Sequence, residues 1–197
     1  MKKYLKHLTI AFLSSCVICL FIYYPFMCTD MHIKIYFNDD SDYTTCNIYY
    51  TTENTPNMSN DTLIHAKMHD GYADLILSKD FCNKLTGLRL DFSPAEKLIC
   101  IKRIELCSGG FVRKSYDASK FFDQSNIVAT NDLSALQHVD SLTYIKTSGN
   151  DPYIVFHPNL VKECNDAYSH YTGTKVLICL FLIGTWILSR KKYFTAD

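Results

Sequence analysis

Apolar residues are concentrated in two segments, one near each end of the chain. Residues 8–28 contain no Asp, Glu, Lys or Arg, and as a helix they are about 30 Å long, which matches the hydrocarbon core of a bilayer. Residues 174–189 hold a shorter apolar run, and Lys175 lengthens it by extending its charged group toward the membrane surface. Both segments are predicted to be transmembrane helices, with a buried core helix as the alternative for the second.

Between these segments, residues 29–173 show the period-two alternation of β-strands. Ile33, Ile35 and Phe37 share one face, as do Leu88, Leu90 and Phe92. The predicted strands are 32–37, 46–52, 72–77, 87–92, 98–107, 142–146 and 153–156. The apolar phase of 98–107 changes at Lys102–Arg103, which predicts a β-bulge.

Clusters of Gly, Pro, Asn, Asp and Ser separate the predicted strands and favour turns. Two short helices are predicted, one over residues 117–124 and one over residues 132–138 after an Asn131 cap. Many short strands separated by turns are typical of a β-sandwich or jelly roll. The predicted fold is therefore mainly β, a sandwich or jelly-roll domain flanked by two transmembrane helices.

Positive charge marks both ends of the chain. Residues 1–7 contain three Lys, and residues 190–197 begin with Arg190-Lys191-Lys192. Because cytoplasmic flanks of membrane spans are enriched in Lys and Arg, both ends are predicted to be cytoplasmic and residues 29–173 extracytoplasmic. The lipid bilayer is then the first partner of this two-pass cell-membrane protein.

The zero net charge of the chain combines two unlike parts. Residues 29–173 carry a net charge of −6, and the remaining residues carry the compensating positive charge. An acidic outer domain argues against a nucleic-acid partner, because a nucleic-acid-binding surface requires a basic excess.

Two short motifs in the middle domain resemble a known family. Leu88–Phe92 reads LRLDF and Ile99–Leu106 reads ICIKRIEL, which is similar to the "LRLDP … I-I-x-I-x-L" pattern of a bacterial jelly-roll module. The Gly149–Tyr153 segment resembles the entry to the last strand of that module. The module is galactose-binding-like and occurs as an extracytoplasmic insert in membrane proteins of surface-polysaccharide synthesis and in rhamnan-synthesis-type glycosyltransferases. The resemblance implies a carbohydrate ligand, but this chain contains no glycosyltransferase domain and no catalytic motif.

Several aromatic and charged residues are candidates for a sugar site. Tyrosine rings stack on the apolar faces of sugars, while Arg and Asp form hydrogen bonds with hydroxyl groups. The candidates are Tyr49, Tyr50, Tyr72, Arg89, Asp91 and Tyr153. The alternative is that the tyrosines are core or cross-strand residues and that Arg89 and Asp91 form a surface pair.

Asp39, Asp40 and Asp42 form the densest acidic cluster of the chain. Their carboxylates are suited to a structural Ca²⁺ site, because calcium prefers several oxygen ligands. The alternative is a solvated turn, which Asp and Ser also favour. We expect no other cofactor.

The chain has nine cysteines, and their state depends on the compartment. In an oxidising extracytoplasmic space some of Cys46, Cys82, Cys100, Cys107 and Cys164 form disulfides, whereas in a reducing setting all stay thiols. Residues 13–16, LSSC, resemble a bacterial lipobox, which gives lipidation at Cys16 as an alternative to the first membrane span. The apolar sequence after Cys16 favours the span.

These observations predict a non-enzymatic accessory of the cell envelope that binds a glycan or a protein partner. The first alternative is an enzyme or enzyme subunit that modifies envelope glycans. The second is a structural subunit that docks to a polytopic membrane protein such as a glycosyltransferase.

Overall fold

The computed structural model describes residues 30–168 apart from 40, 43–44, 82–83 and 94–95. Both predicted membrane segments, 8–28 and 174–189, lie outside this range. Within it, no helix is long and apolar enough to cross a bilayer.

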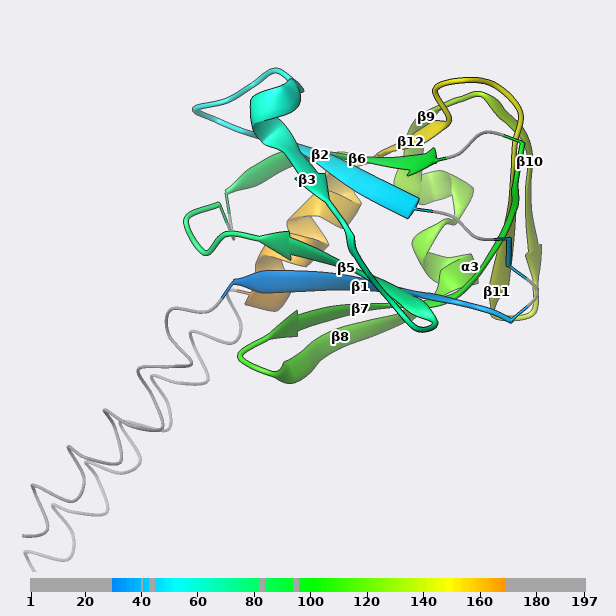
Figure 1. Cartoon of the computed structure of the whole chain (residues 1–197). Coiled ribbons are helices and arrows are strands. Elements are labelled where there is room, and N and C mark those ends of the chain that lie inside the picture. Colours follow the sequence, from blue (N-terminus) through cyan, green and yellow to red (C-terminus); the bar gives the residue numbers. More distant parts are fainter. Residues whose placement is uncertain (1–29, 40, 43–44, 82–83, 94–95, 169–197) are drawn as a thin grey trace, which may run out of the picture. The chain divides into compact units, whose positions relative to one another are not determined.

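The described residues are mainly β and form two antiparallel sheets (Figure 1). The larger sheet has the order β10-β11-β7-β1-β5-β4, and β8 pairs with the second half of β7. Its strands are β1 (Met31–Phe37), β4 (Lys67–His69), β5 (Tyr72–Leu77), β7 (Leu98–Ser108), β8 (Phe111–Asp117), β10 (Leu133–Val139) and β11 (Leu142–Thr147). The smaller sheet, in the order β3-β2-β6-β12-β9, consists of β2 (Thr45–Thr52), β3 (Leu63–His65), β6 (Leu85–Ser93), β9 (Ile127–Asn131) and β12 (Tyr153–Phe156). All seven strands predicted from the sequence are confirmed.

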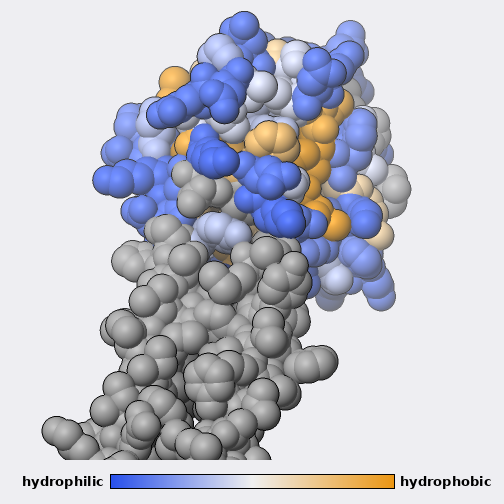
Figure 2. All heavy atoms as spheres, turned by 90° about the vertical axis from the view of Figure 1, so that its left-hand side faces the viewer, coloured by the Kyte–Doolittle hydropathy of each residue, from blue (hydrophilic) through white to orange (hydrophobic). Residues whose placement is uncertain are grey.

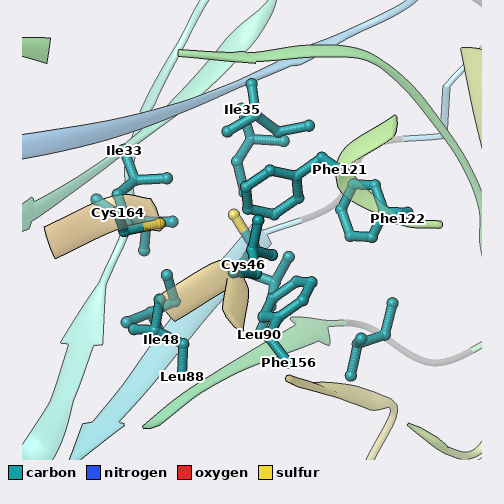
Figure 3. Close-up of a cluster of buried hydrophobic side chains, with 14 of the residues drawn as sticks. Ile33, Ile35, Cys46, Ile48, Leu88, Leu90, Phe121, Phe122, Phe156 and Cys164 are labelled. Carbon is teal, nitrogen blue, oxygen red and sulfur yellow. The ribbon is translucent and has the colours of Figure 1, made fainter. Parts of the chain in front are cut away.

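The core lies between the inner faces of the two sheets (Figure 3). Ile33 and Ile35 of β1 face it from the larger sheet, and Ile48, Leu88 and Leu90 face it from the smaller one; each is at most 3% exposed. Phe121, Phe122 and Phe156 fill one part of this space with ring centroids 5.2–5.9 Å apart. The predicted alternation therefore gives a β-sandwich character, since apolar residues at every second position bury one face of each sheet.

The predicted bulge in the longest strand is confirmed. Tyr36 of β1 pairs with Arg103 of β7, and the next residue, Phe37, pairs with Ile101, so the register passes over Lys102. Lys102 is exposed, while Ile101 and Ile104 are fully buried. The bulge keeps apolar residues on the inner face on both sides of the phase change.

The predicted helix over residues 132–138 is wrong. Residues 133–138 lie in β10, which pairs with β11 along a hairpin. Leu, Ala and Gln favour a helix locally, but Asp132 adopts a φ of 51°, which turns the chain into the strand. Tertiary pairing then overrides helix propensity.

The predicted helix over 117–124 is shorter than expected. It comprises α3 (Ala118–Phe121) and a separate 3₁₀ turn, η3 (Gln124–Asn126). The turn begins where the Asp123 side chain accepts a hydrogen bond from the Ser125 amide. A second 3₁₀ turn, η2 (Asn60–Thr62), precedes β3.

A helix over residues 158–168 completes the described chain. Its buried positions, Leu160, Val161 and Cys164, recur with helical spacing and join the core. The Asn165 side chain ties it to β6, because its amide donates to the Leu85 carbonyl at 2.8 Å and its oxygen accepts from the Leu85 amide at 3.3 Å.

Candidate binding face

The structure brings four of the predicted ligand residues together on the outer face of the smaller sheet. Tyr49 of β2 lies opposite Arg89 of β6, and Asp91 of β6 lies opposite Tyr153 of β12. Their side chains point outward because the alternate residues, such as Ile48 and Leu90, are buried in the core. Tyrosines 50 and 72 are not part of this group.

Tyr50 and Tyr72 occupy different surfaces. Tyr50 faces the core, where it is 6% exposed and packs against Phe81 with ring centroids 5.0 Å apart. Tyr72 lies in the larger sheet, stacked between Tyr36 at 5.2 Å and His69 at 4.6 Å. The core interpretation therefore holds for Tyr50, and the cross-strand interpretation holds for Tyr72.

Arg89 organises the group. Its Nε donates to Asp91 Oδ1 at 2.7 Å and its Nη2 to Asp91 Oδ2 at 2.6 Å, so the pair is bidentate. The same Nη2 donates to Asp151 Oδ1 at 3.1 Å. The guanidinium carbon lies 3.8 Å from the Tyr153 ring centroid and 5.1 Å from that of Tyr49. One cation thus fixes two carboxylates and contacts two aromatic rings.

Burial shapes the electrostatics of this pair. Burial acts to lower the pKa of Arg89, but the hydrogen bonds and charges of Asp91 and Asp151 outweigh it, so the pKa of Arg89 is raised and the guanidinium stays charged. Burial also raises the pKa of Asp91, in spite of the opposing effect of Arg89. The side chain of Asp91 is only 14% exposed. A poorly hydrated carboxylate of this kind is stabilised by any further hydrogen-bond donor.

Sequence reasoning missed three residues that lie in line with Asp91 and Tyr153. Register places five side chains in one line across all five strands of the smaller sheet: His65, Asn47, Asp91, Tyr153 and Asn131, named here the polar row. His65 Nδ1 lies 2.9 Å from Asn47 Oδ1, and Asn131 Nδ2 donates to the Asp151 carbonyl at 2.8 Å. Asn47 is two residues before Tyr49 and therefore faces the same side of β2, which could have been predicted from the sequence. The pairing of these residues with other strands could not, because a single sequence does not show cross-strand register.

The larger sheet carries a different outer surface. Arg103 lies 4.1 Å from the Tyr36 ring centroid, and the Tyr36 hydroxyl donates to Glu105 at 2.9 Å. Together with Tyr72 and His69, these residues form a continuous stack across β4, β5, β1 and β7. The ring faces pack against one another, as in ordinary cross-strand stabilisation.

The acidic cluster in the β1–β2 connection is used structurally where the structure describes it. Asp42 Oδ2 accepts from the Leu98 amide at 2.8 Å, and the Asp42 amide donates to the Leu98 carbonyl at 2.8 Å. Asp40 lies outside the described residues, and Asp39 is in a turn. Among the described residues no group of three or more His, Cys, Asp or Glu is arranged to hold a metal ion.

Three of the described cysteines are free thiols. Cys46 and Cys164 are fully buried, and burial raises the pKa of each to about 12. Cys107 is 6% exposed, and burial raises its pKa as well. Cys100 is fully buried and Cys82 lies outside the described residues.

An open cleft of about 430 Å³ lies away from the polar row. It is lined by Thr52, Glu53, Asn54, Lys84, Leu85, Thr86 and Asn165. None of the residues predicted from the sequence to bind a ligand lines it.

No protein-family model matches the chain, and no match was found among the curated proteins or the solved structures. The resemblance of residues 88–92 and 99–106 to a galactose-binding-like module therefore stays a prediction. Those residues lie in β6 and β7, at the centre of the two sheets.

Proposed function

We propose that this protein is a membrane-anchored, extracytoplasmic module of the cell envelope that binds a carbohydrate on the polar row. The observation that carries this proposal is the polar row itself, which aligns donors and acceptors with the Tyr153 ring on an outer sheet face, beside Tyr49. The two apolar terminal segments and their basic flanks support the membrane anchor. The jelly-roll assignment and a partner in polysaccharide-synthesis machinery, such as a polytopic glycosyltransferase, belong to the same proposal.

The polar row offers complementary chemistry for sugar hydroxyls. Asp91 accepts hydrogen bonds, and the amides of Asn47 and Asn131 both donate and accept them. Tyr153 presents an aromatic ring beside these groups, suited to the C–H face of a pyranose. Arg89 holds the Asp91 carboxylate and the Tyr153 ring in place before a ligand arrives, which lowers the entropic cost of binding.

The dimensions of the row favour an oligosaccharide over a single sugar. Five neighbouring strands about 4.8 Å apart place its end residues, His65 and Asn131, about 19 Å apart. The ligand is neutral or cationic, since the row lies beside Asp151 and in a domain of net charge −6.

Saturation-transfer NMR on the full chain in lipid nanodiscs tests the proposal. The probes are neutral oligosaccharides cut from bacterial envelope polysaccharides, offered with Ca²⁺ and again with EDTA because residues 39–42 are the predicted cation site. We expect transfer to at least one oligosaccharide, loss of that transfer in Asn47→Ala, and recovery of the sugar with unchanged mass. Transfer to none of them would contradict carbohydrate binding, provided that a near-UV circular dichroism spectrum shows the domain to be folded. A cleaved or modified sugar would favour the enzyme alternative.

A further inference from the structure

One end of the described domain combines both chain connections with an exposed apolar turn. The chain enters at Asp30, and Met31 of β1 pairs with Ser108 at the end of β7. Ser108 pairs in turn with Phe111 at the start of β8, across a Gly109-Gly110 turn with φ values of 59° and 78°. The β7–β8 turn is therefore next to the point of entry.

The chain leaves the described domain at the same end. The helix over residues 158–168 runs beside β8, where Lys114 Nζ donates to Glu163 Oε2 at 2.7 Å. Two residues later, Asn165 bonds to Leu85 at the first residue of β6. Figure 1 shows the end of this helix beside the start of β1. The first and last described residues, Asp30 and Tyr168, thus lie at the end of the domain that carries the β7–β8 turn.

The turn has the composition of a membrane-interface contact. Phe111 is 52% exposed and Val112 is 53% exposed. The Arg113 guanidinium lies 5.3 Å from the Phe111 ring centroid, and the Lys114 side chain is 42% exposed. Figure 2, which faces this end, shows apolar surface among the hydrophilic side chains. Aromatic and aliphatic residues followed by two basic ones are suited to the boundary between acyl chains and anionic headgroups.

We infer that the β7–β8 turn rests in the surface of the lipid bilayer, with Phe111 and Val112 in the interface and Arg113 and Lys114 near anionic headgroups. This inference rests on the membrane anchor of the proposed function. The contact fixes the orientation of the domain on its two connections. From this end β6 runs from Leu85 to Asp91, about 20 Å away, so the polar row is held clear of the headgroups and open to an external glycan.

Tryptophan fluorescence of the full chain tests this contact. The chain has one Trp, so Trp186→Phe provides a silent background for Phe111→Trp. The control is Leu98→Trp, because Leu98 is 43% exposed and lies at the opposite end of β7, about 33 Å from Ser108. Val112→Trp is a second reporter in case Phe111→Trp perturbs the turn. Each variant is reconstituted in vesicles of phosphatidylcholine and phosphatidylglycerol, with or without brominated phosphatidylcholine.

We expect brominated lipid to quench Trp at position 111 or 112 at least threefold more than at position 98, and aqueous acrylamide to show the reverse order. Equal quenching by acrylamide at both ends overturns the inference, because the turn is then in water. Protection from both quenchers also overturns it, because protein then covers the turn. Carbonate extraction of the same vesicles separates the claims. If the chain stays in the vesicles during carbonate extraction but fails the quenching test, only the contact of the turn with the bilayer is refuted. If carbonate removes the chain from the vesicles, both the membrane anchor and this contact are refuted.

Discussion

Arg89 is the residue on which the candidate face depends. The sequence indicated its pairing with Asp91, since residues two apart on a strand share a face. It named Tyr153 as a separate candidate but did not indicate that Arg89 contacts Tyr153 and Asp151, which come from a segment some sixty residues later along the chain. Only the register of β6 with β12 brings them together, and that register depends on the whole sheet.

Removing the cation should destabilise the fold more than removing the ion pair. Arg89→Met leaves the Asp91 carboxylate largely buried without its partner, and we expect the free energy of unfolding to fall by about 2 kcal/mol. In Arg89→Met/Asp91→Leu no charge is left unpaired, so at least half of this loss should be recovered. Urea unfolding followed by circular dichroism measures both. Equal losses in the single and double variants would show that the pair itself contributes the stability.

The buried thiols give a second residue-scale test. Because thiolate is the reactive species and the pKa values of Cys46 and Cys164 are about 12, iodoacetamide at pH 8 should modify both about 100-fold more slowly in the folded protein than in urea. Cys107, on the outer face of the larger sheet, should react faster than either. Peptide mass spectrometry measures each site separately, and rapid native labelling of Cys46 or Cys164 would contradict the described core.

At the level of elements, alternation predicted seven of the strands but not their partners. Strands β3, β4, β8 and β9 were not predicted, and β10 was predicted as a helix. Every strand with a clear period-two pattern is present, and the phase change at Lys102–Arg103 located a real bulge. Residues 132–138 were misjudged because their composition favours a helix while their neighbours in space favour a hairpin. The helix over 158–168 shows the spacing of Leu160, Val161 and Cys164 in the sequence, and Pro158 at its first position is a helix-start signal that the sequence analysis did not use.

The connection between β11 and β12 packs against Asp132, the residue with positive φ that precedes β10. A Cβ on Gly149 would overlap the Asp132 carboxylate, whose Oδ2 also accepts a hydrogen bond from the Asp151 amide at 2.9 Å. Gly149→Ala should therefore lower the free energy of unfolding by about 1–3 kcal/mol. In the Asp132→Gly background the same change should cost less than half as much. An equal cost in both backgrounds, measured by urea unfolding, would refute this contact.

The attachment of the last helix to β8 should depend on pH. The hydrogen bonds of Lys114 and Tyr116 lower the pKa of Glu163. A carboxyl group whose pKa falls on folding stabilises the fold above its unfolded value, near 4.3, and loses that effect as pH falls through the folded value. Because Glu163 is half exposed, we expect Glu163→Gln to cost only about 0.5 kcal/mol at pH 7. The difference should shrink as the pH falls below 4.3, and a difference that stays constant as the pH falls from 7 would contradict the assignment.

At the scale of the whole molecule, the two outer sheet faces differ in kind. In the larger sheet, Tyr36 packs into a stack of rings that ends at Arg103. In the smaller sheet, Tyr153 belongs to the polar row, and Arg89 lies beside that row. The polar row lies toward the end of the domain away from both chain connections. In the proposed membrane-anchored arrangement, the acidic domain stands outside the bilayer and presents this row to the envelope.

The similarity of the two Tyr–Arg contacts provides the most direct test of the central claim. Isothermal titration of the full chain in nanodiscs with the oligosaccharide found by NMR compares Tyr153→Ala with Tyr36→Ala. Each variant removes a tyrosine stacked on an arginine, at 3.8 Å and 4.1 Å from the ring centroid respectively. We expect Tyr153→Ala to raise Kd about tenfold, the equivalent of one aromatic contact, and Tyr36→Ala to change it less than twofold. Wild-type affinity in Tyr153→Ala, or an equal loss in both variants, would contradict binding on the polar row.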